Sequence, residues 1–188
     1  MKKIFFMALM AVMSISASAQ IEQGLRFGVQ GFGGINSIGE DGAKTAVTYG
    51  AGVVAEYNFS ENFYLGSGLN FQNKGWKADW LDGTANVYYL TLPIHLGGRV
   101  SIGDNSYFHF QAGPQLGFGV AGSDIEIYEV GTAKYSDWGK RFEAGVGAKV
   151  GVEFNKLQVN VSGNYGITEC MDGAGHNLDF AVGVAYMF

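Results

Sequence analysis

The chain has one cysteine, two prolines and, beyond residue 19, no apolar run of helix-spanning length. The lone Cys170 excludes an internal disulfide and leaves two interpretations, an incidental loop thiol or a thiol with an intermolecular or reactive role. Scarce proline, with 30 glycines spaced through alternating segments, is not typical of a disordered or collagen-like chain. If the chain spans a membrane, it must therefore do so as a closed β-barrel, because open sheet edges stay unsatisfied in lipid.

Basic residues are also scarce, with 12 Lys and Arg against 17 Asp and Glu. Two of them, Lys2 and Lys3, precede a short apolar run and the small residues Ala17-Ser18-Ala19. This order predicts a cleavable signal peptide over residues 1–19 and one remaining domain over 20–188. That domain would hold ten basic and seventeen acidic residues, a net charge of −7, which argues against nucleic acid as a partner.

Residues 141–154 alternate strictly between apolar side chains and charged residues or glycine. A period of two places the two sets on opposite faces of a strand, and fourteen residues suit a tilted membrane-crossing strand with an overhang. Seven further segments alternate in a similar way: 25–35, 47–59, 63–72, 89–99, 108–118, 157–167 and 177–188. The sequence therefore predicts eight strands.

The charged residues of these segments all fall on the polar face: Arg26, Glu56, Arg99, Arg141, Glu143, Lys149, Glu153 and Asp179. A basic residue facing lipid near the middle of a membrane costs about 2–4 kcal/mol, whereas a water-facing surface needs no such exclusion. We therefore predict an all-β fold, an eight-stranded antiparallel up-and-down transmembrane barrel with its apolar face outward. A soluble lipocalin-like barrel, the alternative, would have the reverse sidedness.

The connectors alternate in length, which is typical of outer-membrane barrels. Short connectors lie at 60–62, 101–106 and 155–156, and the long loops lie at about 36–46, 73–86, 120–140 and 168–176. We expect the termini in the periplasm and the long loops outside the cell. We also expect 125–130 and 133–138 to extend two strands as a hairpin, and a bulge or bend at Pro93 and at Pro114.

Four acidic and four basic residues make up the predicted interior charge set. Equal numbers favour an ion-pair plug over a lining of one sign, because an unpaired charge in a narrow lumen is costly. A narrow ion or proton path is the alternative. His95 and His109 also point inward on neighbouring strands, and we interpret them as members of the polar network in preference to a metal or acid–base site.

Three tryptophans lie in the expected long loops: Trp76, Trp80 and Trp138. We expect Trp76 and Trp138 to join an interfacial aromatic belt, while Trp80 belongs either to that region or to a surface that contacts a protein or glycan. The long loops hold ten acidic and five basic residues. These acids are either solvated or hold divalent cations that bridge lipopolysaccharide phosphates.

No spacing selects a catalytic set. Ser123, Asp172 and His176 lie in the long loops or at their margins without the arrangement of a hydrolytic triad. The glycine cluster at 28–34 precedes no helical pattern, so it does not fit a phosphate-binding loop. We predict no enzymatic activity, no cofactor and no metal.

Several stretches resemble the PorT-like small outer-membrane barrels of the Bacteroidetes, which are similar in architecture to the eight-stranded enterobacterial barrels. They are residues 90–96, 111–117, 142–154, 164–168 and the aromatic end 186–188. The resemblance implies an outer-membrane location and a C-terminal Phe188 that the barrel-insertion machinery recognises.

Two functional hypotheses follow. The first is a structural or surface-interaction barrel whose four loops contact lipopolysaccharide, neighbouring proteins or glycans. The second, implied by the PorT-like resemblance alone, is an accessory role in type IX protein secretion. A narrow channel and a lipid-modifying enzyme are the less favoured alternatives.

Overall fold

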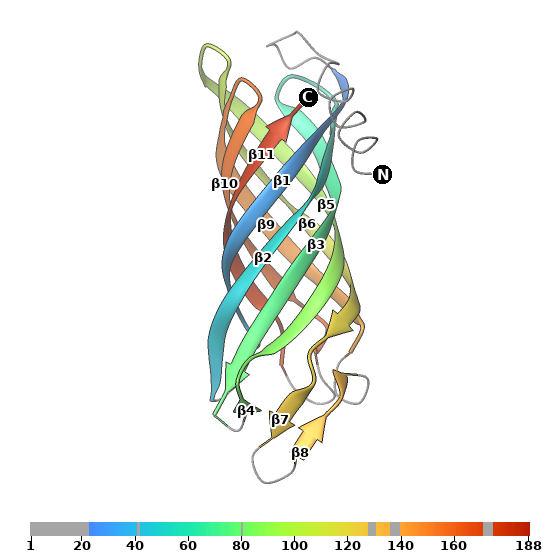
Figure 1. The fold of residues 1–188 in the computed structure, drawn as a ribbon. Helices are drawn as coiled ribbons and strands as arrows, with labels where there is room; N and C mark the ends of the chain where they lie inside the picture. Colours follow the sequence, from blue (N-terminus) through green and yellow to red (C-terminus); the bar gives the residue numbers. More distant parts are fainter. Residues whose placement is uncertain (1–22, 41, 80, 128–130, 136–139, 171–174) are drawn as a thin grey trace, which may run out of the picture.

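The computed structural model describes residues 23–188 except 41, 80, 128–130, 136–139 and 171–174, so the predicted signal peptide lies outside the described residues. Eight long antiparallel strands form a closed barrel in the order β1-β11-β10-β9-β6-β5-β3-β2 (Figure 1). Their bounds are β1 Gly24–Ser37, β2 Ala43–Asn58, β3 Phe63–Ala78, β5 Ala85–Gly103, β6 Ser106–Gly122, β9 Phe142–Phe154, β10 Leu157–Gly166 and β11 Leu178–Met187. The predicted eight-stranded barrel is confirmed.

The two ends of the barrel differ. At the turn end, β1 begins, β11 ends and short turns join neighbouring strands (Figure 1). Two of these turns use Asn105 and Asn155 at φ values of 52° and 56°, a left-handed conformation that asparagine tolerates. At the opposite, loop end, β4 (Leu81–Asp82), β7 (Ile125–Ile127) and β8 (Gly131–Ala133) form a separate three-stranded sheet in the order β4-β7-β8.

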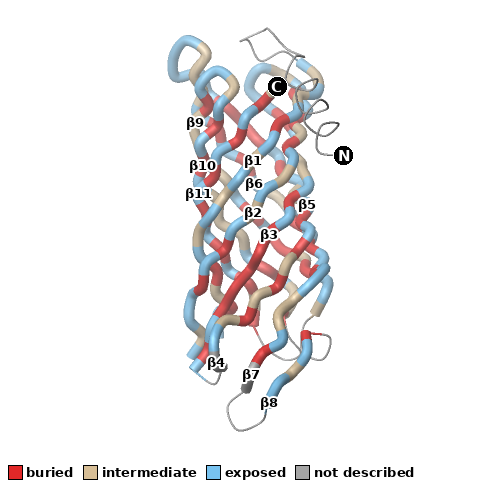
Figure 2. Tube along the Cα trace, viewed as in Figure 1, coloured by how far each residue is buried: buried red, intermediate tan, exposed pale blue. Residues whose placement is uncertain are grey.

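The barrel is apolar outside and polar inside. On β9, Phe142, Val146, Val150 and Phe154 are each between 47% and 55% exposed, whereas Glu143 is 5% exposed. Exposed and buried residues alternate along the long strands (Figure 2). This sidedness rules out the soluble ligand-binding barrel, whose interior would be apolar. No helix in the described part of the chain has the length and apolarity to cross a membrane.

Several strands extend into ranges that we predicted to be loops. β3 and β5 stay paired as far as Trp76 and Ala85, and only residues 79–84 connect the two strands. The loop predicted at 73–86 is therefore too long at both ends. β6 likewise reaches Gly122. The predicted hairpin above the barrel exists in part, as β7 paired with β8, but it forms a sheet with β4 and does not extend the barrel strands.

We expected a bulge or a bend at each proline, and a bulge is absent at both. Pro93 pairs with Gln115 in the same register as the following pairs of β5 and β6, and Pro114 stands opposite Val146 without a register shift. A proline removes one N–H donor, but its fixed φ is compatible with an extended strand, so the ladder loses a bond and keeps its register. The register shifts fall elsewhere, including one between Thr45 and Thr48 of β2.

Candidate functional site

Two clusters of ion pairs fill the lumen, one near each end. The turn-end cluster consists of Arg26, Glu56, Arg99, Glu153 and Gln158, which come from five different strands. Both glutamates are 1% exposed and Arg99 is 2% exposed. Inward-facing positions on these strands bring the side chains together because eight strands enclose an interior just wide enough for side chains to fill.

The turn-end cluster is held by short, charge-assisted contacts. Arg26 binds Glu153 with both terminal nitrogens, each at 2.9 Å, and its Nη2 is also 3.1 Å from Glu56 Oε2. Arg99 Nη2 donates to Glu56 Oε2 at 2.8 Å. Gln158 Nε2 donates to both glutamates, at 3.0 Å and 2.9 Å. Two carboxylates therefore balance two guanidinium groups, which offsets much of the cost of burying them.

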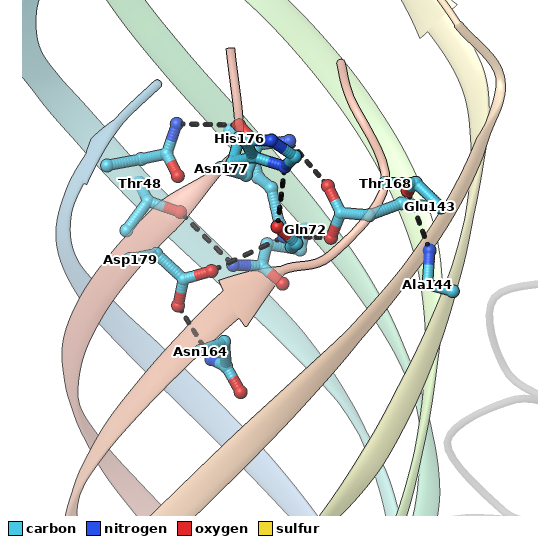
Figure 3. A network of polar contacts seen from close by, with 12 residues as sticks. Thr48, Gln72, Glu143, Ala144, Asn164, Thr168, His176, Asn177 and Asp179 are labelled. Atoms are coloured by element: carbon cyan, nitrogen blue, oxygen red, sulfur yellow. Dashed lines mark hydrogen bonds and ion pairs between the residues drawn. The ribbon is translucent and has the colours of Figure 1, made fainter. Parts of the chain in front are cut away.

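The loop-end cluster consists of Lys74, Glu143, Asp179, Asn177, Asn164 and Asn36. Lys74 Nζ forms an ion pair with Glu143 and lies 3.4 Å from Asp179 Oδ2. Asn177 donates to Glu143, and Asn164 donates to Asp179 at 2.7 Å (Figure 3). Asn36, which is fully buried, donates to Asn177 at 3.2 Å and to the Gly75 carbonyl at 3.1 Å. The cluster joins β1, β3, β9, β10 and β11.

Seven of the eight predicted interior charges lie in the lumen, and Arg141 does not. Arg141 is exposed because β9 begins one residue later, at Phe142, so the alternation no longer governs its direction. The fourth basic side chain inside the lumen is instead Lys74, which is 1% exposed. The alternation could have identified Lys74, since the even-numbered residues of β3 face inward from Tyr64 onward.

Lys149 and the two histidines lie between or beside the clusters. Lys149 and His95 line a cavity of about 40 Å³ in the middle of the lumen, where Lys149 Nζ donates to Gln30 Oε1 at 3.2 Å. His109 is buried as predicted but stands opposite Arg99, toward the turn end. The structure therefore does not bring the two histidines together as a pair, and the described residues contain no group of three metal-ligating side chains.

An apolar cluster, the outer cap, lies at the loop end. It contains Ile38, Trp76, Ala78, Ala85, Ile125 and Cys170, with Ala43 and Ala133 packed against it. Trp76 is 1% exposed, so its predicted place in an interfacial belt is wrong: it occupies an even, inward-facing position of β3. Trp80 and Trp138 lie outside the described residues. The cap packs β7 and the Cys170 segment onto the ends of β1, β3 and β5.

Cys170 is a buried member of this cap and is 8% exposed. Burial, and after it the nearby charge of Glu143, raise the pKa of its thiol to about 12. A thiol that is almost fully protonated is a poor nucleophile. The environment therefore favours the interpretation of Cys170 as a packing residue over a reactive one.

Ser123 and His176, two of the residues considered for a hydrolytic site, form hydrogen bonds with different parts of the chain. Nδ1 of His176 lies 3.1 Å from the Gly166 carbonyl, and His176 stacks on Tyr165. Ser123 Oγ accepts the backbone N–H of Asn86 at 3.0 Å, and Asp172 lies outside the described residues. Phe188 packs edge-on against Tyr186, and its N–H donates to the Phe27 carbonyl. Its role as an insertion signal stays a prediction.

A closed eight-stranded barrel with an apolar exterior and a charged lumen defines a small integral outer-membrane barrel. The chain matches the family of the outer membrane protein β-barrel domain over residues 16–172, and it belongs to this family. Membership of this family places the protein in the outer membrane.

Solved structures with the same fold include two outer-membrane proteins. The attachment invasion locus protein Ail of Yersinia pestis is similar with a TM-score of 0.51 and 14% identity, over 89% of this chain and 100% of that one. Neisserial surface protein A is similar with a TM-score of 0.53 and 12% identity, over 88% of this chain and 100% of that one. At these identities the likeness shows the fold alone. No curated protein matches the chain.

Proposed function

We propose that the protein is a plugged outer-membrane anchor that presents its loop end to partners at the cell surface. The observation that carries this proposal is the filling of the lumen: two ion-pair clusters and the outer cap occupy the interior, while β4, β7 and β8 project at one end (Figure 1). A barrel filled in this way is suited to holding a surface and poorly suited to general diffusion.

The outer cap supports a rigid surface at the loop end. The β7 residue Ile125 is 3% exposed and packs in one apolar cluster with Ile38, which directly follows β1, and with residues of β3 and β5. Gly175 N–H donates to Glu40 at 2.7 Å, and Lys140 pairs with Glu169 at 2.9 Å, so different outer connections are also tied to one another. Ordered loops bind partners at a lower entropic cost than loops that must first be immobilised.

Lipopolysaccharide is the partner that the outer rim of β2 and β3 favours. Lys44 and Lys77 stand directly opposite each other on these strands and both are exposed, and Lys44 also forms an ion pair with the exposed Asp79. Toward the middle of the barrel the same face carries the stacked rings of Phe71 and Tyr88, 5.6 Å apart. Exposed ion pairs are weak, so Lys44 can exchange its partner for a phosphate group, and both lysines, above outward-facing aromatic rings, suit a membrane interface where one unpaired lysine contributes about 1 kcal/mol.

Changing both lysines tests this partner. We expect a Lys44→Gln/Lys77→Gln double variant to unfold at a lower urea concentration than the wild-type protein in bilayers that contain lipopolysaccharide, and at the same concentration in phosphatidylcholine bilayers. Lys134→Gln, at another exposed lysine, is the matched control. Heat-modifiable gel migration checks that each barrel is folded. If lipopolysaccharide stabilised the double variant as much as it stabilises the wild-type protein, it would be excluded as the partner of these two lysines.

The PorT-like resemblance supports a second candidate, an accessory role in protein secretion. Its motifs lie on the barrel strands themselves, so they are specific for the architecture more than for an activity. A gene deletion in the native organism distinguishes the candidates. Loss of cargo secretion, restored by the wild-type gene, would favour the secretion role, and unchanged secretion would exclude it.

A further inference from the structure

Two glycines on the outer face of β1 have no packing reason to be glycine. Gly31 and Gly33 are exposed, and a Cβ on either would have its nearest neighbour at 3.9 Å. Away from the strand ends, every other glycine of the described barrel strands would place a Cβ 3.3 Å or less from another atom. A side chain would fit at Gly31 and Gly33, and glycine inside a strand lowers stability. Such glycines mark places where another molecule approaches the backbone closely.

The exposed backbone of β1 continues as a low apolar surface onto β2. Ala51 stands directly opposite Gly31, Tyr49 stands opposite Gly33, and both β2 residues are exposed. We call Gly31, Gly33 and Ala51 the glycine strip. Its outer surface consists of one methyl group and of backbone whose polar groups are paired in the ladder, with the Tyr49 ring beside it. A hydrocarbon chain that lies on this strip gains close contact with the backbone.

A row of polar side chains borders the glycine strip. Tyr49, Asn73 and Tyr88 stand opposite one another on β2, β3 and β5. The Tyr49 and Tyr88 hydroxyls are hydrogen-bonded to each other, which uses one of their two hydrogens and leaves the other able to donate. Asn73 is 1% exposed, and its Oδ1 has no hydrogen-bond partner in the described part of the chain. Buried polar atoms are nearly always paired, so the protein alone leaves this row incomplete.

The two lysines of the outer rim lie beyond this row. Lys77 is four residues nearer the loop end than Asn73 on the same strand, a separation of about 13 Å, and Lys44 stands opposite Lys77. The strands β1, β2 and β3 lie side by side (Figure 1). From the rim toward the middle of the barrel, their outer face therefore presents cations, a hydroxyl donor and an apolar strip. A lipid with a phosphate, an acyl linkage and a hydrocarbon chain has the complementary groups in the same order.

We propose that this face seats the acylated end of one lipopolysaccharide molecule. Its phosphate lies at Lys44 and Lys77, the carbonyl of an acyl linkage accepts from the Tyr49–Tyr88 pair, and the acyl chain lies on the glycine strip. This inference rests on the proposed function, because it takes the lipid at the two lysines to be lipopolysaccharide. A second copy of the barrel would bring an apolar face to the tyrosine donor, so the lipid is the favoured occupant.

Filling the glycine strip tests the acyl seat. A Gly31→Leu/Gly33→Leu variant should unfold in phosphatidylcholine bilayers at the same or a higher urea concentration than the wild-type protein, because the side chains fit and leucine suits a strand better than glycine. The added side chains keep an acyl chain away from the backbone. The rise in urea midpoint that lipopolysaccharide gives the wild-type protein should therefore fall to about half or less. A full rise in this variant would overturn the seat.

A matched control lies on the far side of the barrel. Ala112 and Ala148 are exposed, pair with each other on β6 and β9, and are distant from β1 in the ring of strands. Ala112→Leu/Ala148→Leu adds the same kind of side chain there and should keep the full rise with lipopolysaccharide. An equal reduction in both variants would show a general effect of leucine on the outer face and would refute the seat.

Two further variants separate this inference from the proposed function. Tyr49→Phe/Tyr88→Phe keeps both rings and removes the donor, so the rise with lipopolysaccharide should shrink while the midpoint in phosphatidylcholine stays unchanged. If Lys44→Gln/Lys77→Gln loses the rise and the leucine variant keeps it, lipopolysaccharide stands as the partner and the acyl seat is refuted. If both keep it, lipopolysaccharide is refuted too. A dimer in detergent, seen by sedimentation and abolished by the leucine variant, would assign the strip to a second copy and overturn the proposal.

Discussion

At the scale of single residues, we expect each ion pair of the lumen to have a large effect on the free energy of unfolding. Each charged group is buried, so removing one partner leaves the other without compensation. Lys74 is the sharpest case, because it stands between two carboxylates. Its ammonium also lies 5.5 Å from the centre of the Tyr89 ring, a cation–π contact that adds to the same position.

We therefore expect Lys74→Met to lower the free energy of unfolding by about 3–5 kcal/mol, because Glu143 and Asp179 would remain buried without their cation. Urea titration of the barrel in lipid bilayers measures the loss. Adding Glu143→Gln to Lys74→Met should restore a large part of it. Arg141→Met, at an exposed position, should change the stability by no more than about 0.5 kcal/mol. An equal loss in both single variants would contradict the placement of Lys74.

Cys170 makes a second prediction at this scale. With a thiol pKa of about 12, the thiolate fraction at pH 8 is about three orders of magnitude below that of an ordinary cysteine. We expect maleimide to label the folded protein more slowly than unfolded protein by at least that factor, and labelling to become fast on heat unfolding. A Cys170→Ser protein carrying Lys134→Cys is the exposed control. Rapid labelling of folded Cys170 would show that the cap is open.

At the scale of elements, the alternation of polar and apolar residues predicted the eight strands and seven of the eight interior charges. It failed at strand ends. The sequence places Lys74 and Trp76 in a loop, because the apolar outward positions of β3 give way to Asn73 and Gly75, although the inward-facing alternation continues. The partners within each cluster could not be predicted, since they depend on barrel register, which brings Arg26 opposite Glu56.

The two prolines show a related limit. A proline in a sequence predicts a missing donor, but whether the strand bulges depends on its neighbours in the sheet. At Pro93, Ser67 of β3 donates its hydroxyl to the proline carbonyl at 2.8 Å, a side-chain contact across the ladder that a sequence pattern does not reveal. The bulge between Thr45 and Thr48 of β2 has no comparable signal in the sequence.

The sidedness of β9 gives a prediction for a whole element. Val150 points outward and is 47% exposed, while its neighbour Lys149 lines the lumen. Val150→Arg should therefore lower the free energy of unfolding in bilayers by about 2–4 kcal/mol, the cost of a basic side chain facing lipid near the membrane midplane. Urea titration measures the change, and Val150→Leu is the matched control with nearly unchanged stability. A neutral effect of arginine would mean that this face of β9 is in water.

At the scale of the whole molecule, the two clusters and the outer cap lie in series along the lumen. An ion that crossed the barrel would have to pass the Arg26–Glu153 contact, the small central cavity and the Lys74–Glu143 pair before it met the cap. Two of these barriers, the Arg26–Glu153 contact and the Lys74–Glu143 pair, are buried ion pairs that the ion would have to separate. Because the lumen is closed at several levels, opening one level is not sufficient for an ion to pass.

This arrangement predicts that purified barrels inserted in planar bilayers show no sustained conductance above the bare membrane, in contrast to a general porin measured as a positive control. Separating a buried pair costs several kcal/mol. Openings of all levels together are therefore rare and brief, whereas a channel with a lining of one sign would stay open. Insertion is verified on the same preparation by heat-modifiable migration. Steady, ion-selective openings of the wild-type protein would instead favour the channel alternative and would require the two clusters to rearrange together.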